Sequence, residues 1–326
     1  MAPRFSIIIP VKAINDYVRE TVPHILNLAN QDWELIIIPN ATDTSEWDDP
    51  RIIVVASGRV GPAKKRDQGA DLAQGEILVF LDDDSYPASD LLDVAAKHFV
   101  DPDVVALGGP AVTPPHDSFW QKVSGAVFLS RLSGGTPERY VPAGEVRPVD
   151  DWPSVNLMVR REAFLDIGGF NSPYWPGEDT KLCLDLVTKT GRKLLYVPEL
   201  IVWHHRRAGL TAHLKQVGNY GLHRGFFAKR FPETSRRPMY FVPMLFMLFT
   251  IFSLGYTIYP AIIQTAILLG WCCYATALLI SLTTIARHES LLIGLVALGY
   301  TFLSHLVYGA MFLRGLLTRE LVSQLR

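Results

Sequence analysis

The sequence predicts an α/β domain with a mostly parallel sheet flanked by helices, followed by a C-terminal transmembrane helical region. Two observations carry this prediction. Short Val- and Ile-rich runs alternate with helical patterns over residues 1–110, which is typical of a parallel sheet buried on both faces. Long uncharged stretches follow Arg237, and each is long enough for at least one membrane helix.

Five apolar runs in the first third of the chain predict strands at residues 5–10, 33–39, 51–57, 76–81 and 103–109. Helical patterns lie between several of these runs, at residues 16–30, 63–73 and 89–100. Further along, apolar residues repeat with helical spacing from Thr180, and another strand starts at Ile201. The chain is therefore divided into an α/β domain at 1–210, an interfacial amphipathic helix and linker at 211–237, and a membrane domain at 238–326.

The C-terminal part has no Asp, Glu, Lys or Arg from Pro238 to Ala286, and again none from Ser290 to Leu313. At roughly 20 residues per crossing, the first stretch holds two helices and the second holds one. Gly and Pro in GYTIYP separate the first two. The three expected segments are 239–258, 261–285 and 290–313.

The polar part should stay on the cytosolic side of a cell membrane. No apolar signal precedes the membrane domain, because the N-terminal run is short and contains an early proline. Four basic residues before the first segment agree with the positive-inside tendency: Lys229, Arg230, Arg236 and Arg237. The expected protein is multi-pass with membrane lipids as partners. Three full crossings would put Arg314, Arg319 and Arg326 outside, against that tendency, so one segment is alternatively re-entrant or interfacial.

The charges argue against a nucleic-acid partner. Lys and Arg total 31 and Asp and Glu total 32, and a net charge of -1 gives no general attraction to nucleic acid. Up to Arg237 the chain carries 27 basic and 30 acidic residues. The three cysteines, Cys183, Cys272 and Cys273, form no disulfide framework and suit a reducing compartment.

An acidic triplet, Asp82-Asp83-Asp84, follows the fourth predicted strand. Ligands of open α/β sheets bind at the carboxyl ends of the strands, where Pro10 and Asn40 also fall. Adjacent carboxylates repel one another unless a cation neutralises them, and Mg or Mn holding phosphate oxygens suits this position. The alternative is an acidic loop that leads into the next helix.

The joint order of five motifs resembles that of family 2 inverting glycosyltransferases, which have a GT-A-type fold. The motifs are SIIIPVK, ELIIIPNATD, GPAKKRDQGADLAQGEILVFLDDDSYP, REAFLDIGGF and GEDTKLCLDL, and they cover about residues 4–207. This resemblance implies that residues 1–210 form a GT-A-like glycosyltransferase domain. It also implies a metal-dependent transfer of a hexosyl or related group from a nucleotide-sugar donor.

The resemblance assigns the donor side of the site. Asp82 and Asp84 would hold the ribose and the metal as an Asp-x-Asp motif, with Asp83 between them. Arg66 would face the nucleotide, although a solvated basic turn is the alternative for this run and above all for Lys64 and Lys65. Pro10 and Asn40 complete the donor side, and Asn40 replaces the acidic residue that family members commonly carry there.

The motif YWPGEDTKLCLDL places Glu178 and Asp179 where a loop meets a helix. The resemblance implies that Asp179 is the general base for the acceptor hydroxyl, with Glu178 as the neighbouring catalytic candidate. The alternative is that Asp179 only caps the helix. Trp175 is either a wall on which a sugar stacks or a core aromatic.

A basic run, His204, His205, Arg206 and Arg207, stands where related membrane-bound transferases carry a Gln/Arg/Trp-type motif. Guanidinium groups bind phosphate oxygens, so this run and Arg224 are predicted to contact the acceptor or the diphosphate. A surface for anionic lipid and a zinc site at the two histidines are alternatives. The interfacial helix at 211–230 contains three glycines, which argue against one unbroken helix: Gly218, Gly221 and Gly225.

The leading function is a membrane-bound inverting glycosyltransferase that acts on a lipid-linked glycan hydroxyl in cell-envelope polysaccharide or glycolipid synthesis. A polyprenyl-phosphate sugar synthase is the alternative, because a phosphate acceptor is already ionised and needs no base. A sugar-phosphate nucleotidyltransferase would be expected to show a Gly-rich loop where this chain has PVKAIND. A membrane scaffold or transporter is disfavoured, since His305 is the only readily titratable group in the apolar segments.

Overall fold

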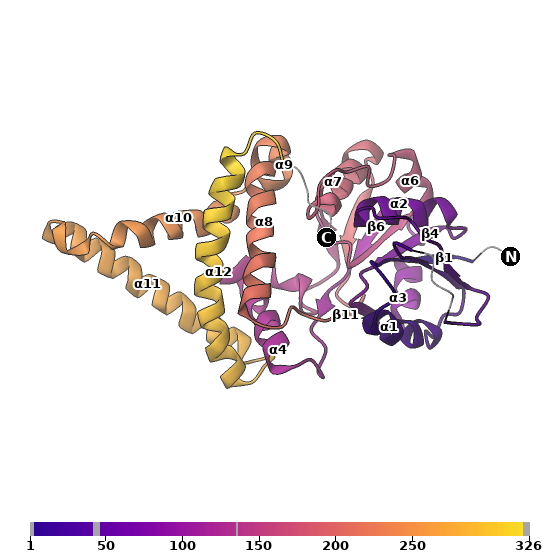
Figure 1. The fold of residues 1–326 in the computed structure, drawn as a ribbon, viewed down its shortest axis with the longest axis horizontal. Coiled ribbons are helices and arrows are strands. Elements are labelled where there is room, and N and C mark those ends of the chain that lie inside the picture. Colours follow the sequence, from indigo (N-terminus) through magenta and orange to yellow (C-terminus); the bar gives the residue numbers. More distant parts are fainter. Residues whose placement is uncertain (1–2, 42–45, 135, 322–326) are drawn as a thin grey trace. The chain divides into compact units, whose positions relative to one another are not determined.

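The structure is a computed structural model that describes residues 3–41, 46–134 and 136–321. The chain forms two compact units (Figure 1). Among the described residues, the first unit comprises those up to Pro114 and Val141–His205, and the second comprises Pro115–Tyr140 and Arg206–Leu321. The units are therefore interleaved along the chain, unlike the linear division at residue 210.

The first unit is built on an eight-stranded sheet with the order β3-β2-β1-β4-β9-β6-β10-β8. Neighbouring strands are parallel except that β9 runs antiparallel to β4 and β6, and β8 runs antiparallel to β10. This confirms the mostly parallel sheet. The strands are β1 Phe5–Pro10, β2 Trp33–Ile38, β3 Ile52–Val54, β4 Ile77–Leu81, β6 Val104–Gly108, β8 Arg147–Val149, β9 Asn156–Arg160 and β10 Lys193–Tyr196.

Helices cover both faces of this sheet, because successive strand residues point to opposite faces and both sets are apolar. Ile7 and Ile9 of β1 belong to one core cluster, with residues of α1 and α3, whereas Ile8 belongs to the other, with residues of α2, α6 and α7. The helices are α1 Asp16–Leu26, α2 Pro62–Leu72, α3 Leu91–His98, α6 Arg161–Asp166 and α7 Glu178–Thr190.

A small second sheet has the order β5-β11-β7, with strands β5 Ser85–Pro87, β7 Ala111–Val112 and β11 Val202–His204. The antiparallel pairing of β11 with β5 sets His204 opposite Ser85, the residue that follows the acidic triplet. The sheet thus joins two segments that are far apart in the sequence.

The second unit is helical. Residues 115–140 contribute α4 Phe119–Ala126, η1 Val127–Leu129, α5 Arg131–Gly134 and η2 Pro137–Arg139. The C-terminal part contributes α8 Leu210–Arg230, α9 Pro232–Ser235, α10 Pro238–Ser253, η3 Tyr256–Ile258, α11 Ala261–Ile285 and α12 Leu291–Leu317.

The helix predicted at 211–230 is present, and despite its three glycines α8 is one continuous helix of 21 residues. Its glycines allow the backbone of α12 to approach closely. A Cβ added at Gly221 would lie 2.6 Å from the carbonyl oxygen of Tyr308, and one at Gly225 would lie 2.1 Å from that of Phe312. Small residues therefore serve helix packing here.

Two helices, α11 and α12, are long and apolar enough to cross a membrane by length and composition. The first expected segment, 239–258, is shorter in the structure, since α10 has 16 residues and ends at Ser253. At 1.5 Å per residue, α10 extends only about 24 Å, less than the roughly 30 Å hydrocarbon core of a bilayer.

Candidate active site

The acidic triplet lies at the carboxyl end of β4, as expected for a ligand edge. Asp84 is buried, and its Oδ1 lies 3.1 Å from Nε2 of His204, which the small sheet brings there. Asp82, Asp84 and His204 each offer a ligand atom, and these atoms lie within 4.8 Å of one another. The two carboxylates are the oxygen donors that Mg and Mn prefer, and His204 adds an imidazole nitrogen, so the residues fit a divalent metal.

Asp83 does not belong to this group of possible metal ligands and instead contacts Asn15. Nδ2 of Asn15 donates to Oδ2 of Asp83 at 2.8 Å, while Oδ1 of Asn15 accepts from the amide of Val18 and caps α1. Asp83 is thus tied to the start of the first helix. The sequence analysis did not identify Asn15 as a residue of the site. The only signal available in the sequence was its position just before the predicted helix, where Asn is a common N-cap residue.

Arg66 connects the acidic triplet to the predicted catalytic pair. Its guanidinium donates to Asp82 Oδ1 at 2.5 Å and to Glu178 Oε1 at 3.1 Å, and the side chain is only 3% exposed. The solvated basic turn considered for this residue is therefore wrong. Arg66 joins carboxylates that are 96 residues apart in the sequence.

Glu178 is almost fully buried next to this guanidinium. Burial, together with the neighbouring Asp179 carboxylate, raises the pKa of Glu178 to about 7, even though Arg66 acts in the opposite direction. Ionisation of the Glu178 carboxyl is therefore unfavourable at this buried position. The charge of Glu178, and with it the ion pair with Arg66, depends on pH near neutrality.

Asp179 is the second residue of α7 and is half-buried. The N-cap position belongs to Gly177, which has a φ of 112°, so Asp179 is not the N-cap residue of the helix. Its Oδ1 accepts from the amide of Thr180 at 2.8 Å, and its Oδ2 accepts from the amide of Ser154 at 3.3 Å. These two contacts fix the carboxylate at the start of a regular helix.

Lys65 holds the ends of β1 and β2 together. Its Nζ donates to the carbonyl oxygens of Val11 and Ile38 and, at 2.6 Å, to Oδ1 of Asn40. The side chain is 4% exposed, and burial lowers its pKa to about 8. A solvated turn is therefore wrong for Lys65 as well, whereas the neighbouring Lys64 is exposed.

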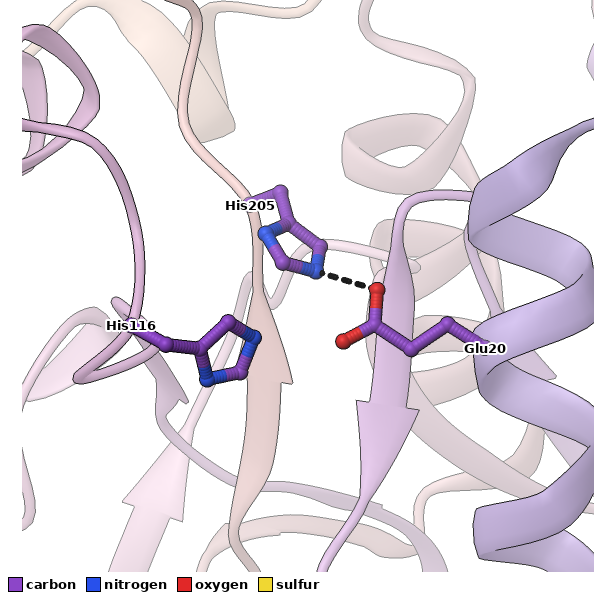
Figure 2. Close-up of side chains that lie close together, drawn as sticks. All are labelled: Glu20, His116 and His205. Carbon is purple, nitrogen blue, oxygen red and sulfur yellow. Dashed lines mark hydrogen bonds and ion pairs between the residues drawn. The ribbon is translucent and has the colours of Figure 1, made fainter.

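The remaining predicted residues of the first unit lie as follows. Pro10 is the buried last residue of β1, and Trp175 is half-buried in the segment before α7. His205 is buried, and its Nε2 lies 3.0 Å from Oε2 of Glu20 in α1 (Figure 2). Glu20 could not be recognised from the sequence, because only the fold brings α1 to the end of β11.

Three predicted arginines belong to the second unit. The amide of Arg206 donates to Asp117 at 3.3 Å, and its guanidinium lies over the ring of Tyr140 at 5.1 Å. Arg224 donates to Ser235 Oγ at 3.2 Å and lies 4.8 Å from the ring centroid of Tyr240. Arg207 is half-buried. A phosphate-binding role for these arginines stays a prediction.

Together, the strand-end carboxylates and the helix-borne Asp179 define an α/β protein with a candidate metal and acid–base site. The chain belongs to glycosyl transferase family 2, because the model of that family, described as "Glycosyl transferase family 2", matches residues 6–168. The fold is the GT-A-like fold that the sequence predicted.

Similar proteins agree with this assignment. A pre-mycofactocin glycosyltransferase from Mycobacterium tuberculosis is 30% identical over 173 residues, which are 53% of this chain and 36% of that protein. A glucosyl-dolichyl phosphate glucuronosyltransferase from Haloferax volcanii is 22% identical over 212 residues, 57% of this chain and 63% of its own length. This chain thus spans about a third of the length of the first relative and less than two thirds of the second.

A solved structure shares the fold. The mannosyltransferase from Pyrobaculum calidifontis, in complex with GDP-Man and Mn2+, superposes with a TM-score of 0.53 and 19% identity. The match covers 98% of this chain and 89% of that one.

Proposed function

We propose that this family 2 glycosyltransferase is an inverting enzyme that moves a hexosyl or related sugar to a hydroxyl of a lipid-linked glycan. It would act on the cytosolic face of a cell membrane, in cell-envelope polysaccharide or glycolipid synthesis. The observation that carries the proposal is the Asp179 carboxylate, half-buried and held by two backbone amides in the first turn of α7. A hydroxyl acceptor needs such a base, since its proton must leave as it attacks.

The proposed reaction is a single displacement at the anomeric carbon. The acceptor oxygen forms a bond to that carbon, the bond to the diphosphate oxygen breaks, and Asp179 takes the hydroxyl proton. The configuration of the sugar inverts, so an α-linked donor gives a β-linked product. Arg66 positions the site by pairing with both Asp82 and Glu178.

Asp82, Asp84 and His204 would hold a divalent metal, Mg or Mn. Such an ion supplies charge stabilisation for the departing diphosphate. The Mn2+ bound in the Pyrobaculum mannosyltransferase structure supports this metal class. His204 thereby receives a different role from the acceptor contact predicted for it, whereas Pro10, Asn40 and Asp83 remain on the donor side.

A lipid-linked acceptor is supported by two observations. The name of the Haloferax relative refers to a dolichyl phosphate-linked sugar. The second unit carries apolar helices that are candidate membrane spans. Trp175, His205, Arg206, Arg207 and Arg224 are the proposed acceptor-side residues.

The experiment is a transfer assay with the purified chain, a panel of nucleotide sugars, and Mg2+ or Mn2+. Once a donor is found, Asp179→Asn is compared with Asp185→Asn, a carboxylate of the same helix that pairs with Lys181 and Lys189. We expect Asp179→Asn to lower turnover about 100- to 10,000-fold and Asp185→Asn to change it little.

The identity of the acceptor distinguishes the proposed enzyme from a polyprenyl-phosphate sugar synthase. Transfer to a polyprenyl-diphosphate glycan with loss of activity in Asp179→Asn supports the proposal. Transfer to polyprenyl phosphate with normal turnover in Asp179→Asn would identify a polyprenyl-phosphate sugar synthase instead. No turnover of any nucleotide sugar would contradict both.

A further inference from the structure

The two units carry opposite net charges. Over Pro115–Tyr140 and Arg206–Leu321 there are 14 Lys and Arg against 5 Asp and Glu, a net charge of +9. The rest of the chain therefore carries -10, since the total is -1. A linear division hides this contrast because the units are interleaved. Positive charge next to uncharged apolar helices is the pattern of a protein that binds anionic lipid.

Helix α12 runs beside α8 in the same direction. Near the start of α8, Nε2 of His213 lies 2.9 Å from Oγ of Ser304. At its end, Nζ of Lys229 donates to the carbonyl oxygen of Thr318 at 2.7 Å. The second half of α12 is thus level with the whole of α8, and the basic ends of both helices lie together.

The middle of α12 lies against residues 127–134. Oγ of Ser133 is 3.4 Å from Oγ1 of Thr301, and Nε2 of His305 donates to the carbonyl oxygen of Leu132 at 2.9 Å. Most of α12 therefore lies against other segments of the second unit. If α12 crossed a bilayer, α8 would have to cross with it and carry the exposed Lys215 into hydrocarbon, which is costly.

Helices α10 and α11 form a helical hairpin that extends away from α12. They meet α12 partway along it, where the rings of Phe246 and Trp271 lie 6.0 and 6.4 Å from that of Phe302. From there they extend as the arms of a V toward a common tip (Figure 1). Nε1 of Trp271 donates to Oγ of Ser253 at 3.2 Å, which ties the two arms together.

The tip of this hairpin is strongly apolar and exposed. Leu254, Ile258 and Ile262 are 83%, 82% and 80% exposed. The hairpin contains no charged residue, and it is preceded by Arg236 and Arg237 and followed by Arg287. Basic residues at both ends of an uncharged hairpin agree with entry and exit through the same, cytosolic face.

We propose that the second unit lies on an anionic lipid bilayer with α8 and α12 along its surface and only the α10–α11 hairpin inserted. Both ends of α12 then face the same side of the membrane. Three crossings would put Arg314 and Arg319 outside, against the positive-inside tendency. In the proposed arrangement both arginines lie on the cytosolic side, in agreement with that tendency. It rests on the membrane attachment in the proposed function, and not on the chemistry of transfer.

Cysteine labelling of the full chain tests the sidedness. In a background with Cys272→Ser and Cys273→Ser, single cysteines are introduced at His288, Glu320 and Ile258, all of which are exposed. Inverted and right-side-out membrane vesicles from the expression host are treated with a membrane-impermeant maleimide. Detergent-solubilised samples give the full extent of labelling for each variant.

We expect His288→Cys and Glu320→Cys to be labelled fully in inverted vesicles and protected in right-side-out vesicles. Ile258→Cys should stay unlabelled in inverted vesicles. Labelling of His288→Cys and Glu320→Cys from opposite sides would show that α12 crosses the membrane and would overturn the proposal. Full labelling of Ile258→Cys in inverted vesicles would show that the hairpin is not inserted, and would overturn the membrane attachment itself.

Discussion

The buried carboxyl of Glu178 predicts how stability depends on pH. Its pKa is raised from 4.5 to about 7 by burial and by the Asp179 carboxylate. Between these two values the folded chain keeps a proton that the unfolded chain has lost. Stability is therefore lost as the pH rises from about 5 to above 7, and Glu178→Gln, which cannot ionise, should lack this loss.

The magnitude follows from the size of the shift. Each pKa unit corresponds to about 1.4 kcal/mol, so the wild type should lose about 3 kcal/mol more than Glu178→Gln between pH 5 and pH 8. For a unit of this size, 1 kcal/mol shifts the melting temperature by about 2–4 °C. The difference in melting temperature between the wild type and Glu178→Gln should thus change by roughly 6–12 °C between pH 5 and pH 8.

Thermal unfolding in detergent, followed by tryptophan fluorescence, to which the buried Trp33 and Trp152 of the first unit contribute, measures this difference. Glu162→Gln is the matched control, because Glu162 pairs with Arg192 at the surface and should leave the wild-type pH dependence unchanged. Parallel melting curves for the wild type and Glu178→Gln across pH 5–8 would refute the reasoning.

Four further predictions follow from single contacts. His204→Ala should weaken Mn2+ binding in calorimetry at least about tenfold, whereas His98→Ala at the end of α3 should not; equal affinities would remove His204 from the metal site. Lys65→Met should destabilise the chain by about 1–3 kcal/mol by removing the hydrogen bonds of Nζ to the strand-end carbonyls and to Asn40, and the exposed Lys64→Met should be neutral in the same melting assay. Gly225→Ala should lower the melting temperature, since its Cβ would meet α12, while Gly299→Ala, which has open space, should not lower it. Truncation after Arg237 removes α12 from the glycine-lined face of α8, so the product should aggregate on gel filtration; a monodisperse product would contradict this packing.

The amino-acid sequence by itself determined the local elements of the first unit. Continuous Val- and Ile-rich runs can be stable only if both faces of a sheet are covered, and such runs predicted β1, β2, β4 and β6 close to their observed bounds. The acidic triplet could be placed at the ligand edge because parallel strands end at the same edge. The start of α7 was also predictable, since a Pro-Gly pair precedes an apolar repeat.

Only the tertiary structure decided which side chains meet. His204 reaches Asp84 because β11 pairs with β5, and strand pairing between distant segments leaves no local pattern in a sequence. Arg66 and Lys65 are neighbours in one helix, yet one joins two distant carboxylates and the other joins two strand ends. The glycines of α8 argued against an unbroken helix because helix propensity is a local property of the sequence. It does not reflect the backbone of α12, which packs against these glycines. The physical reason is the same in each case: periodicity records which face of an element is apolar, whereas contacts depend on the path of the chain in space.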